Sequence, residues 1–236
     1  MLRENTAVKA AENKVQRYLD PLRDVMESVQ PETFVEPDIL MKRFEELRTC
    51  FDRDYQRVLE VYELLLGEEI AVYGTRAASV FSRWESEGGG PVLPALMVHA
   101  IEFFGLDQAR PGVRAMLASS ILAEIPNHLQ YHGNEHYRKV LFHCIRLIVT
   151  NNLIFRTENP DWVLGPEQIE IFLCAACVHD LGHEGGDNLR DGVYTPGQME
   201  QVAFDIVRPY YEKIGVGRDM AGEIETIVFC TDITFF

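Results

Sequence analysis

Apolar side chains recur along most of the chain at steps of three and four residues, the spacing of amphipathic helices. The run 41–74 shows it most clearly and predicts one long helix or two joined ones. Further helices are expected at 7–29 with an interruption near Pro21, and at 95–104, 113–124, 134–150, 167–178, 197–214 and 220–236. No segment shows a convincing strand alternation, so the pattern predicts an all-α fold.

Proline and glycine mark the expected breaks between these helices. Pro31 and Pro37 oppose a helix across "VQPETFVEPDI", and "ESEGGGPVLP" at 85–94 is the clearest linker signal. The stretch 150–168 is predicted to be a loop. We therefore expect a helical N-terminal region at 1–90 and a second domain at 91–236.

The helices of region 1–90 admit three roles: a dimerisation element, a face that lies on a membrane, or a lid on the core. Their polar faces carry many acidic residues, which disfavours a lipid surface. Packing onto the core or self-association, including a homodimer, is the favoured interpretation.

Charge and composition narrow the class of protein. The 236 residues include 22 Lys and Arg against 37 Asp and Glu, a net charge of −15, which argues against nucleic acid and anionic membranes as partners. An anionic substrate is not excluded, because bound cations can invert the field within one cleft. At 47% hydrophobic residues a sizeable core is expected.

Cysteine usage and the absence of a secretory or membrane-spanning segment favour a cytoplasmic protein. Five cysteines, an odd number without a secretion signal, are expected to be reduced thiols. "CAAC" at 174–177 has the CxxC spacing of redox and zinc sites, but it lies inside an apolar run. We interpret these two cysteines as core packing.

Two clusters of polar side chains have the composition of a metal site. "YHGNEH" at 131–136 contains His132 and His136, and His136 falls in the first turn of a predicted helix. "AACVHDLGHEGGDN" at 175–188 places His179 and Asp180 at the end of another helix, with His183 one turn further on. Imidazole and carboxylate together suit zinc, iron, manganese or cobalt.

These motifs resemble those of the HD-domain metal-dependent phosphohydrolases, and within them the cyclic-nucleotide phosphodiesterase catalytic domain. The matching stretches are "YHGNEH", "HDLGHEGGDN" at 179–188 and "TD" at 231–232, and the resemblance covers roughly residues 127–236. It implies an HD-domain helical bundle that follows the N-terminal helical extension in the sequence.

The resemblance also implies roles for individual residues. His136, His179 and Asp180 would be metal ligands, with Asp180 bridging two metals, and His132 would be the general acid. His183 would hydrogen-bond a metal-bound water. A further set would contact the substrate, the loop or water on the metals: Tyr131, Asn188, Glu200 and Thr231.

The chemistry that these residues suit is phosphoester hydrolysis. One or two divalent ions (Zn, Fe, Mn or Mg) would activate a water and polarise the phosphoryl oxygens. A histidine with a pKa near its usual value would protonate the departing alkoxide. The expected substrate is small and phosphorylated, of nucleotide type.

The sequence departs from the family pattern at several positions. Gly133 stands where the phosphodiesterases usually carry Asn, and Glu184 replaces a common Pro. The family's last metal-ligand Asp and its purine-binding residues lie downstream of "FCTDITFF", where this chain stops, so we expect a domain that is incomplete at its C-terminus. Asp232 is the candidate substitute ligand. The alternative function is a non-catalytic regulatory or interaction protein with an incomplete site.

The remaining histidines and the tryptophans have no position in this template. We expect packing or surface roles for His99, His128 and His143. Trp84 and Trp162 are expected to anchor the core or a loop.

Overall fold

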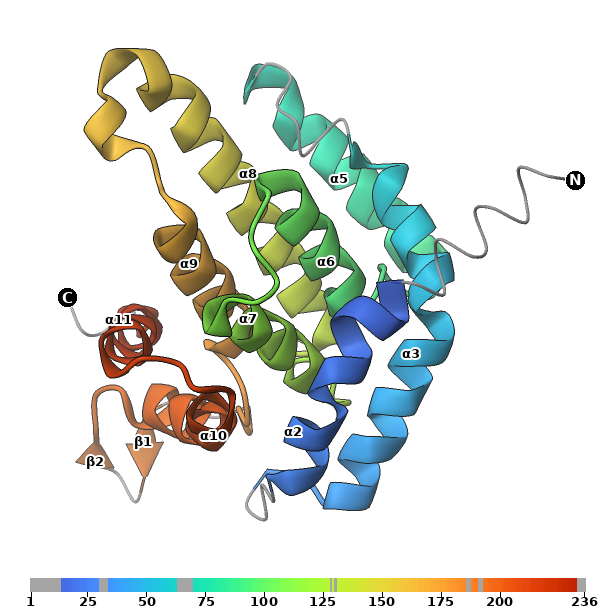
Figure 1. The fold of residues 1–236 in the computed structure, drawn as a ribbon, viewed down its shortest axis with the longest axis vertical. Helices are drawn as coiled ribbons and strands as arrows, with labels where there is room; N and C mark the ends of the chain where they lie inside the picture. Colours follow the sequence, from blue (N-terminus) through green and yellow to red (C-terminus); the bar gives the residue numbers. More distant parts are fainter. Residues whose placement is uncertain are drawn as a thin grey trace, which may run out of the picture.

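The computed structural model describes residues 14–29, 34–62, 70–127, 129, 131–185, 188–190 and 193–232. Helices dominate these ranges, which confirms the predicted all-α fold (Figure 1). The α-helices are α2 (Arg23–Ser28), α3 (Pro37–Leu59), α5 (Ile70–Ser86), α6 (Leu93–Phe104), α7 (Pro111–Leu122), α8 (Asn134–Glu158), α9 (Pro166–Val178), α10 (Gln198–Ile214) and α11 (Arg218–Phe229). No helix within the described residues combines the length and apolar character needed to cross a bilayer.

Three short helical turns and a small hairpin complete the described chain. Val15–Leu19 forms a π-helical turn, and Asp20–Leu22 and Pro160–Trp162 form 3-10 turns. The strands β1 (Leu189–Arg190) and β2 (Val193–Tyr194) pair antiparallel, with Leu189 opposite Tyr194. This hairpin is a correction to the expectation that no strand would form. The parts of the predicted helices before residue 14 and after residue 232 lie outside the described residues.

Proline and glycine set several helix boundaries, as the sequence predicts. Pro37, Pro111 and Pro166 are the first residues of α3, α7 and α9, where the fixed φ of proline suits a helix and its missing N–H costs nothing. Gly105 and Gly215 end α6 and α10 in the left-handed conformation, with φ of 64° and 87°.

Helix α8 runs to Glu158, so the predicted loop over 150–168 is wrong for its first half. Two asparagines that resemble loop residues in sequence lie inside the helix and bind the returning chain. Asn151 Nδ2 donates to the Trp162 carbonyl at 3.0 Å. Asn152 exchanges two hydrogen bonds with the backbone of Leu164, at 3.1 and 2.8 Å. The connection therefore spans only residues 159–165.

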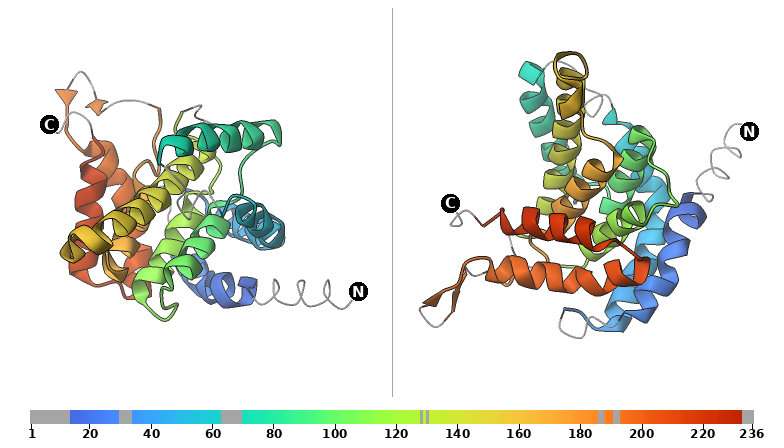
Figure 2. Two further views of the ribbon diagram at one scale, coloured as in Figure 1. Left: turned by 90° about the horizontal axis from the view of Figure 1, so that it is seen from above. Right: turned by 60° about the vertical axis from the view of Figure 1, so that its left-hand side comes forward.

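The helices are arranged around α6, α7, α8 and α9, which pack against one another at the centre of the fold (Figure 1). α3 packs on α6, and α5 lies against α8 through the rings of Phe81, Trp84 and Phe142. α10 and α11 run side by side across the direction of α8 and α9 (Figure 2). Trp84 is fully buried, in agreement with its expected anchoring role.

One cluster of buried apolar side chains includes residues from both sides of the predicted boundary at residue 90. Phe44 and Phe51 of α3 belong to it together with Leu96 of α6. The apolar face of α3 is thus buried inside the protein, as expected if these helices pack on the core. The division into two domains and self-association stay predictions.

The predicted linker at 85–94 contains the turn between α5 and α6, in which Gly90, Pro91 and Val92 are buried. Buried carboxylates accept its backbone N–H groups. Asp54 accepts from Val92 at 3.1 Å, and Glu124 accepts from Leu93 at 2.7 Å. Water cannot reach these backbone N–H groups, and the two carboxylates serve as their hydrogen-bond acceptors instead. The turn is therefore part of the core.

Glu124 is also the centre of a buried ion-pair network. Its carboxylate is fully buried and receives Nη2 of Arg43 and Nη2 of Arg138, each at 2.7 Å. The network joins α3 and α8 to the end of α7. Two guanidinium groups and a backbone N–H compensate the loss of hydration of one carboxylate.

The cysteines of "CAAC" lie in the core, as the packing interpretation predicts. Cys174 and Cys177 are both fully buried in α9 and unpaired. Burial raises the pKa of Cys174 to about 12 and that of Cys177 well above its usual value. Such thiols stay protonated at neutral pH and make poor nucleophiles or metal ligands.

Candidate metal centre

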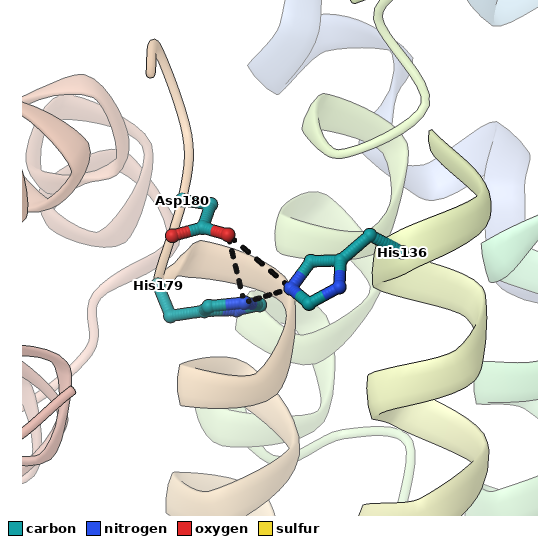
Figure 3. Close-up of side chains that lie close together, drawn as sticks. All are labelled: His136, His179 and Asp180. Carbon is teal, nitrogen blue, oxygen red and sulfur yellow. Dashed lines mark hydrogen bonds and ion pairs between the residues drawn. The ribbon is translucent and has the colours of Figure 1, made fainter. Parts of the chain in front are cut away.

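The start of α8 and the end of α9 bring three metal-ligand side chains together (Figure 3). His136 lies in the first turn of α8. His179 ends α9 in a helical conformation, and Asp180 follows it. The three side chains point toward one another from two helices that pack side by side. These are three of the four metal ligands that the resemblance implies, the fourth being Asp232.

The residues at the start of α8 are held in place by contacts with the end of α7. Asn134 Nδ2 donates to the carbonyls of Ala123 and Ile125, at 2.8 and 2.9 Å. A Cβ atom at Gly133 would stand 2.7 Å from the Leu129 carbonyl oxygen. The backbone here therefore requires glycine, which gives a physical reason for the departure from the Asn of the phosphodiesterases.

The three candidate ligand atoms form a nearly equilateral triangle. His136 Nε2 lies 3.1 Å from His179 Nε2 and 3.3 Å from Asp180 Oδ2. His179 Nε2 lies 3.2 Å from the same carboxylate oxygen. For metal–ligand bonds of about 2.0–2.2 Å, ligand atoms stand about 2.8–3.1 Å apart on an octahedral edge and about 3.3–3.6 Å apart on a tetrahedral one. The triangle fits one divalent transition metal.

The tautomer of His179 leaves the correct nitrogen free for a metal. Its Nδ1 lies 3.1 Å from the carbonyl oxygen of Ala176, which can only accept, so Nδ1 carries the proton. The neutral ring then has its lone pair on Nε2, which faces the triangle. This second-layer hydrogen bond is typical of metal-binding histidines.

Asp180 is ionised in this setting. Burial alone would raise its pKa, but the imidazoles of His136, His179 and His132 around it hold the pKa well below its usual range. A carboxylate with two imidazole nitrogens suits zinc, iron or manganese. Mg²⁺, which prefers oxygen ligands, fits this donor set poorly.

His132 lies on the other side of the same carboxylate oxygen. Its Nδ1 is 2.8 Å from Asp180 Oδ2, and because the carboxylate only accepts, His132 donates from Nδ1. The ring of His183 stacks on His132 with centroids 3.7 Å apart and an interplanar angle of 12°. His183 Nδ1 accepts from Gly185 N at 2.9 Å, so the neutral ring carries its proton on Nε2.

The environment favours the neutral form of His183. Burial lowers its pKa, and the charge of the neighbouring His132 lowers it further. Tyr131 is mostly exposed, and its ring lies 4.9 Å from both His132 and His136, measured between centroids. Tyr131, His132 and His183 therefore border the triangle, as the sequence predicts.

Asp232 belongs to a different group of residues, and it is absent from the set of ligands that gathers around His136. Its Oδ2 accepts from Asn188 Nδ2 and the Tyr194 hydroxyl, each at 2.8 Å, and from Gly197 N at 3.0 Å. In the described structure its carboxylate fixes Asn188, Tyr194 and Gly197, and its role as the fourth ligand stays a prediction.

Asn188 connects this carboxylate to Glu200. Its Nδ2 also donates to Glu200 Oε2 at 3.1 Å, while its Oδ1 accepts from Met199 N at 2.9 Å. The predicted role of Asn188 in supporting the loop agrees with these bonds. The Thr231 hydroxyl, just after the end of α11, donates to the Val228 carbonyl at 2.7 Å.

Some of the contributing groups carried no signal in the sequence. The Ala176 carbonyl, which accepts from His179 Nδ1, is a backbone group that any residue would supply. Tyr194, which donates to Asp232, lies in a hairpin that the pattern did not predict. A pocket beside His183 is lined by side chains from distant segments, Phe34 and Val202 among them. Only the folded chain brings these groups together.

Comparisons with models of protein families, with curated proteins and with solved structures found no match to this chain. The chemistry of the centre therefore rests on its own side chains and on the motifs that they form.

Proposed function

We propose that this protein is a metal-dependent phosphohydrolase that hydrolyses a phosphodiester of nucleotide type. One observation carries the proposal. A single oxygen, Asp180 Oδ2, has three imidazole nitrogens within 3.3 Å, of which two complete a ligand triangle and the third belongs to His132. A purely structural metal site has no use for that third imidazole, whereas hydrolysis needs an acid there.

His136, His179 and Asp180 would hold the cation. A bound divalent ion supplies Lewis acidity and lowers the pKa of a coordinated water. The negative charge of the whole chain makes that local positive charge necessary for a phosphate ester to approach.

His132 would hold and deliver the proton that the leaving group needs. Its Nδ1–H is fixed by Asp180, which orients the ring. The water would give a proton to the solvent as its oxygen forms a P–O bond, the bond to the leaving oxygen would break, and Nε2 of protonated His132 would give its proton to that oxygen. His183, with a proton on Nε2, would hydrogen-bond a water held by the cation, as the resemblance implies.

The second candidate function is a regulatory or interaction protein that binds a metal without turnover. The position of Asp232 favours it, because its carboxylate binds Asn188 and three candidate ligands gather around His136 within the described residues. The phosphodiesterase proposal accordingly needs one cation in this chain, with open positions for water and substrate.

The proposal includes a cytoplasmic location. All five cysteines are unpaired in the described structure, as expected of a protein kept in a reducing compartment. No described contact bears on the proposed homodimer.

The test measures metal content and hydrolysis on the same protein samples. Protein loaded with Zn²⁺ or Mn²⁺ and freed of excess metal should retain about one ion per chain by elemental mass spectrometry and hydrolyse bis(4-nitrophenyl) phosphate. The His179→Ala variant should lose both the bound ion and the hydrolytic activity. His132→Gln should keep the ion and, on a diester with an alkoxide leaving group such as 3′,5′-cyclic AMP, lose about 10²–10⁴-fold in kcat, the usual contribution of a general acid. The loss on bis(4-nitrophenyl) phosphate should be much smaller, because 4-nitrophenoxide leaves without a proton.

His143→Ala is the matched control, because His143 lies on α8, as His136 does, but outside the ligand triangle. It should change neither metal content nor turnover. A metal-loaded protein without turnover, whose His132→Gln variant behaves identically, would favour the non-catalytic alternative. Full metal content in His179→Ala would remove the proposed ligand set.

A further inference from the structure

A cavity of about 710 Å³ adjoins the candidate metal centre, within the range of volumes that hold small organic ligands. His183 forms part of its wall, and Tyr137, next to His136 in the chain, forms another part. Because the His183 ring stacks on His132, the cavity begins where the triangle and its neighbouring histidines end. A ligand with its phosphate at the triangle would have this space beside it.

Apolar side chains from several separate segments line most of the cavity. They include Phe34 before α3, Ile125 after α7, Leu129 before α8, and Val202 and Ile206 of α10. Gly182, with φ of 72°, closes one wall, where a Cβ would stand 2.7 Å from Ile206 Cδ1. The left-handed backbone and the close approach both require glycine at this position.

The charged groups of the lining are acidic. Glu184 and Asp205 are both exposed, and no lysine or arginine lines the cavity among the residues that the structure describes. Asp205 is ion-paired with Arg208, which lies outside the lining, at 2.9 Å, whereas the carboxylate of Glu184 repels a second phosphate or a nucleic-acid strand. An uncharged apolar group meets no such barrier and gains from leaving water.

We infer that this pocket binds an uncharged, mainly apolar ring on one ester oxygen of the substrate, while the phosphate lies at the His136–His179–Asp180 triangle. The position of the phosphate in this inference rests on the proposed function. It assigns a substrate class: phosphodiesters with an apolar ring, in preference to polyphosphates and to diesters with small ester groups. Val202 and Leu129 then act as specificity-determining residues.

Binding of an apolar group in the pocket can be tested without catalysis. N-phenyl-1-naphthylamine, an uncharged apolar fluorescent probe, should bind the wild-type protein saturably. Val202→Trp fills the pocket from a side chain that is 39% exposed, and should weaken probe binding at least 10-fold. Val202→Glu, which adds charge with little bulk, should also weaken it and serves if the tryptophan variant misfolds.

Leu147→Trp is the matched control, because Leu147 is an exposed aliphatic residue on α8 that does not line the pocket. It should leave probe binding unchanged. Equal loss in both tryptophan variants, or unchanged binding in both Val202 variants, would overturn the inference.

The kinetic half compares two diesters with the same leaving group. Val202→Trp should raise KM at least 10-fold for bis(4-nitrophenyl) phosphate and leave KM for methyl 4-nitrophenyl phosphate unchanged. If the wild type hydrolyses both but Val202→Trp alters neither, the pocket is not an ester subsite while the hydrolase proposal stands. If the wild type binds the probe and hydrolyses neither diester, the hydrolase proposal fails and only the apolar pocket is left.

Discussion

His99 is a titratable residue enclosed by aromatic rings. It lies on α6, only 3% exposed, with the ring of Tyr62 at 4.9 Å and those of Tyr55 and Phe103 slightly further away. Its Nε2 has no hydrogen-bond partner among the described residues. Burial lowers its pKa to about 4, although nearby Glu102 opposes the shift. The packing role expected from the sequence agrees with this environment.

The lowered pKa of His99 makes the stability of the protein depend on pH. In the unfolded chain His99 has a pKa near 6.5, so as pH falls from about 6.5 toward 4 the unfolded state takes up a proton that the folded state does not. Stability falls over that window and His99 causes no further loss below it. We expect this residue alone to lower the unfolding free energy by about 2 kcal/mol between pH 7 and pH 5.

Urea denaturation of the wild type and of His99→Leu at both pH values isolates this contribution. The variant should lose less unfolding free energy between pH 7 and pH 5, because leucine does not titrate. The contributions of all other titrating groups are the same in both proteins, so they cancel when one loss is subtracted from the other. Equal losses in the two proteins would show that His99 titrates normally in the fold.

The residue types of the metal triangle could be predicted from the sequence, and the partners of those residues could not. His136, His179 and Asp180 lie at helix ends whose positions follow from local patterns of glycine, proline and apolar residues. The location of Asp232 depends on Asn188 and Tyr194, which are 44 and 38 residues away. Local spacing carries no information about such contacts.

At the scale of the elements, Gly112 allows three helices to pack closely. A Cβ at this position of α7 would stand 2.0 Å from Glu170 Oε2 on α9 and 2.9 Å from Met220 Cε on α11. Glu170 is buried and ion-paired with Arg110. An added methyl group would therefore push a buried carboxylate away from its cation.

Gly112→Ala should destabilise the protein by about 1–3 kcal/mol, the usual cost of overpacking, despite the better helix propensity of alanine. Gly222→Ala on α11 is the matched control, because nothing lies within 4 Å of its added Cβ. It should stabilise by about 0.5–1 kcal/mol. Urea unfolding of both variants measures the signs, and a stabilised Gly112→Ala protein would contradict this packing.

Helix positions were largely predictable from apolar periodicity, and the exceptions have a common cause. Asn151 and Asn152 favour loops by propensity but lie inside α8, because their amides bind the returning backbone at Trp162 and Leu164. The glycines at 88–90 resemble a linker, yet Gly90 N donates to Glu135 Oε1 at 3.0 Å inside a packed turn. Tertiary hydrogen bonds overrode the local signal in both segments.

At the scale of the whole molecule, the open question is whether residues 1–90 form a separate unit. The buried side chains of α3 belong to the same apolar cluster as those of α6, α8 and α9. A shared core implies that the N-terminal helices and the metal centre unfold together, as one cooperative unit. The predicted division at residue 90 implies two units.

Phe51→Ala distinguishes these two cases. Phe51 is fully buried in α3, so its truncation should cost about 3–5 kcal/mol. Native-state hydrogen exchange should then show the most protected amides of α3 and of α9 losing the same free energy of opening. Leu59→Ala, at a 41% exposed position on the same helix, should change neither set by more than about 0.5 kcal/mol. Loss of protection confined to α3 would instead establish an independent N-terminal unit and leave the metal centre in a domain that begins near residue 91.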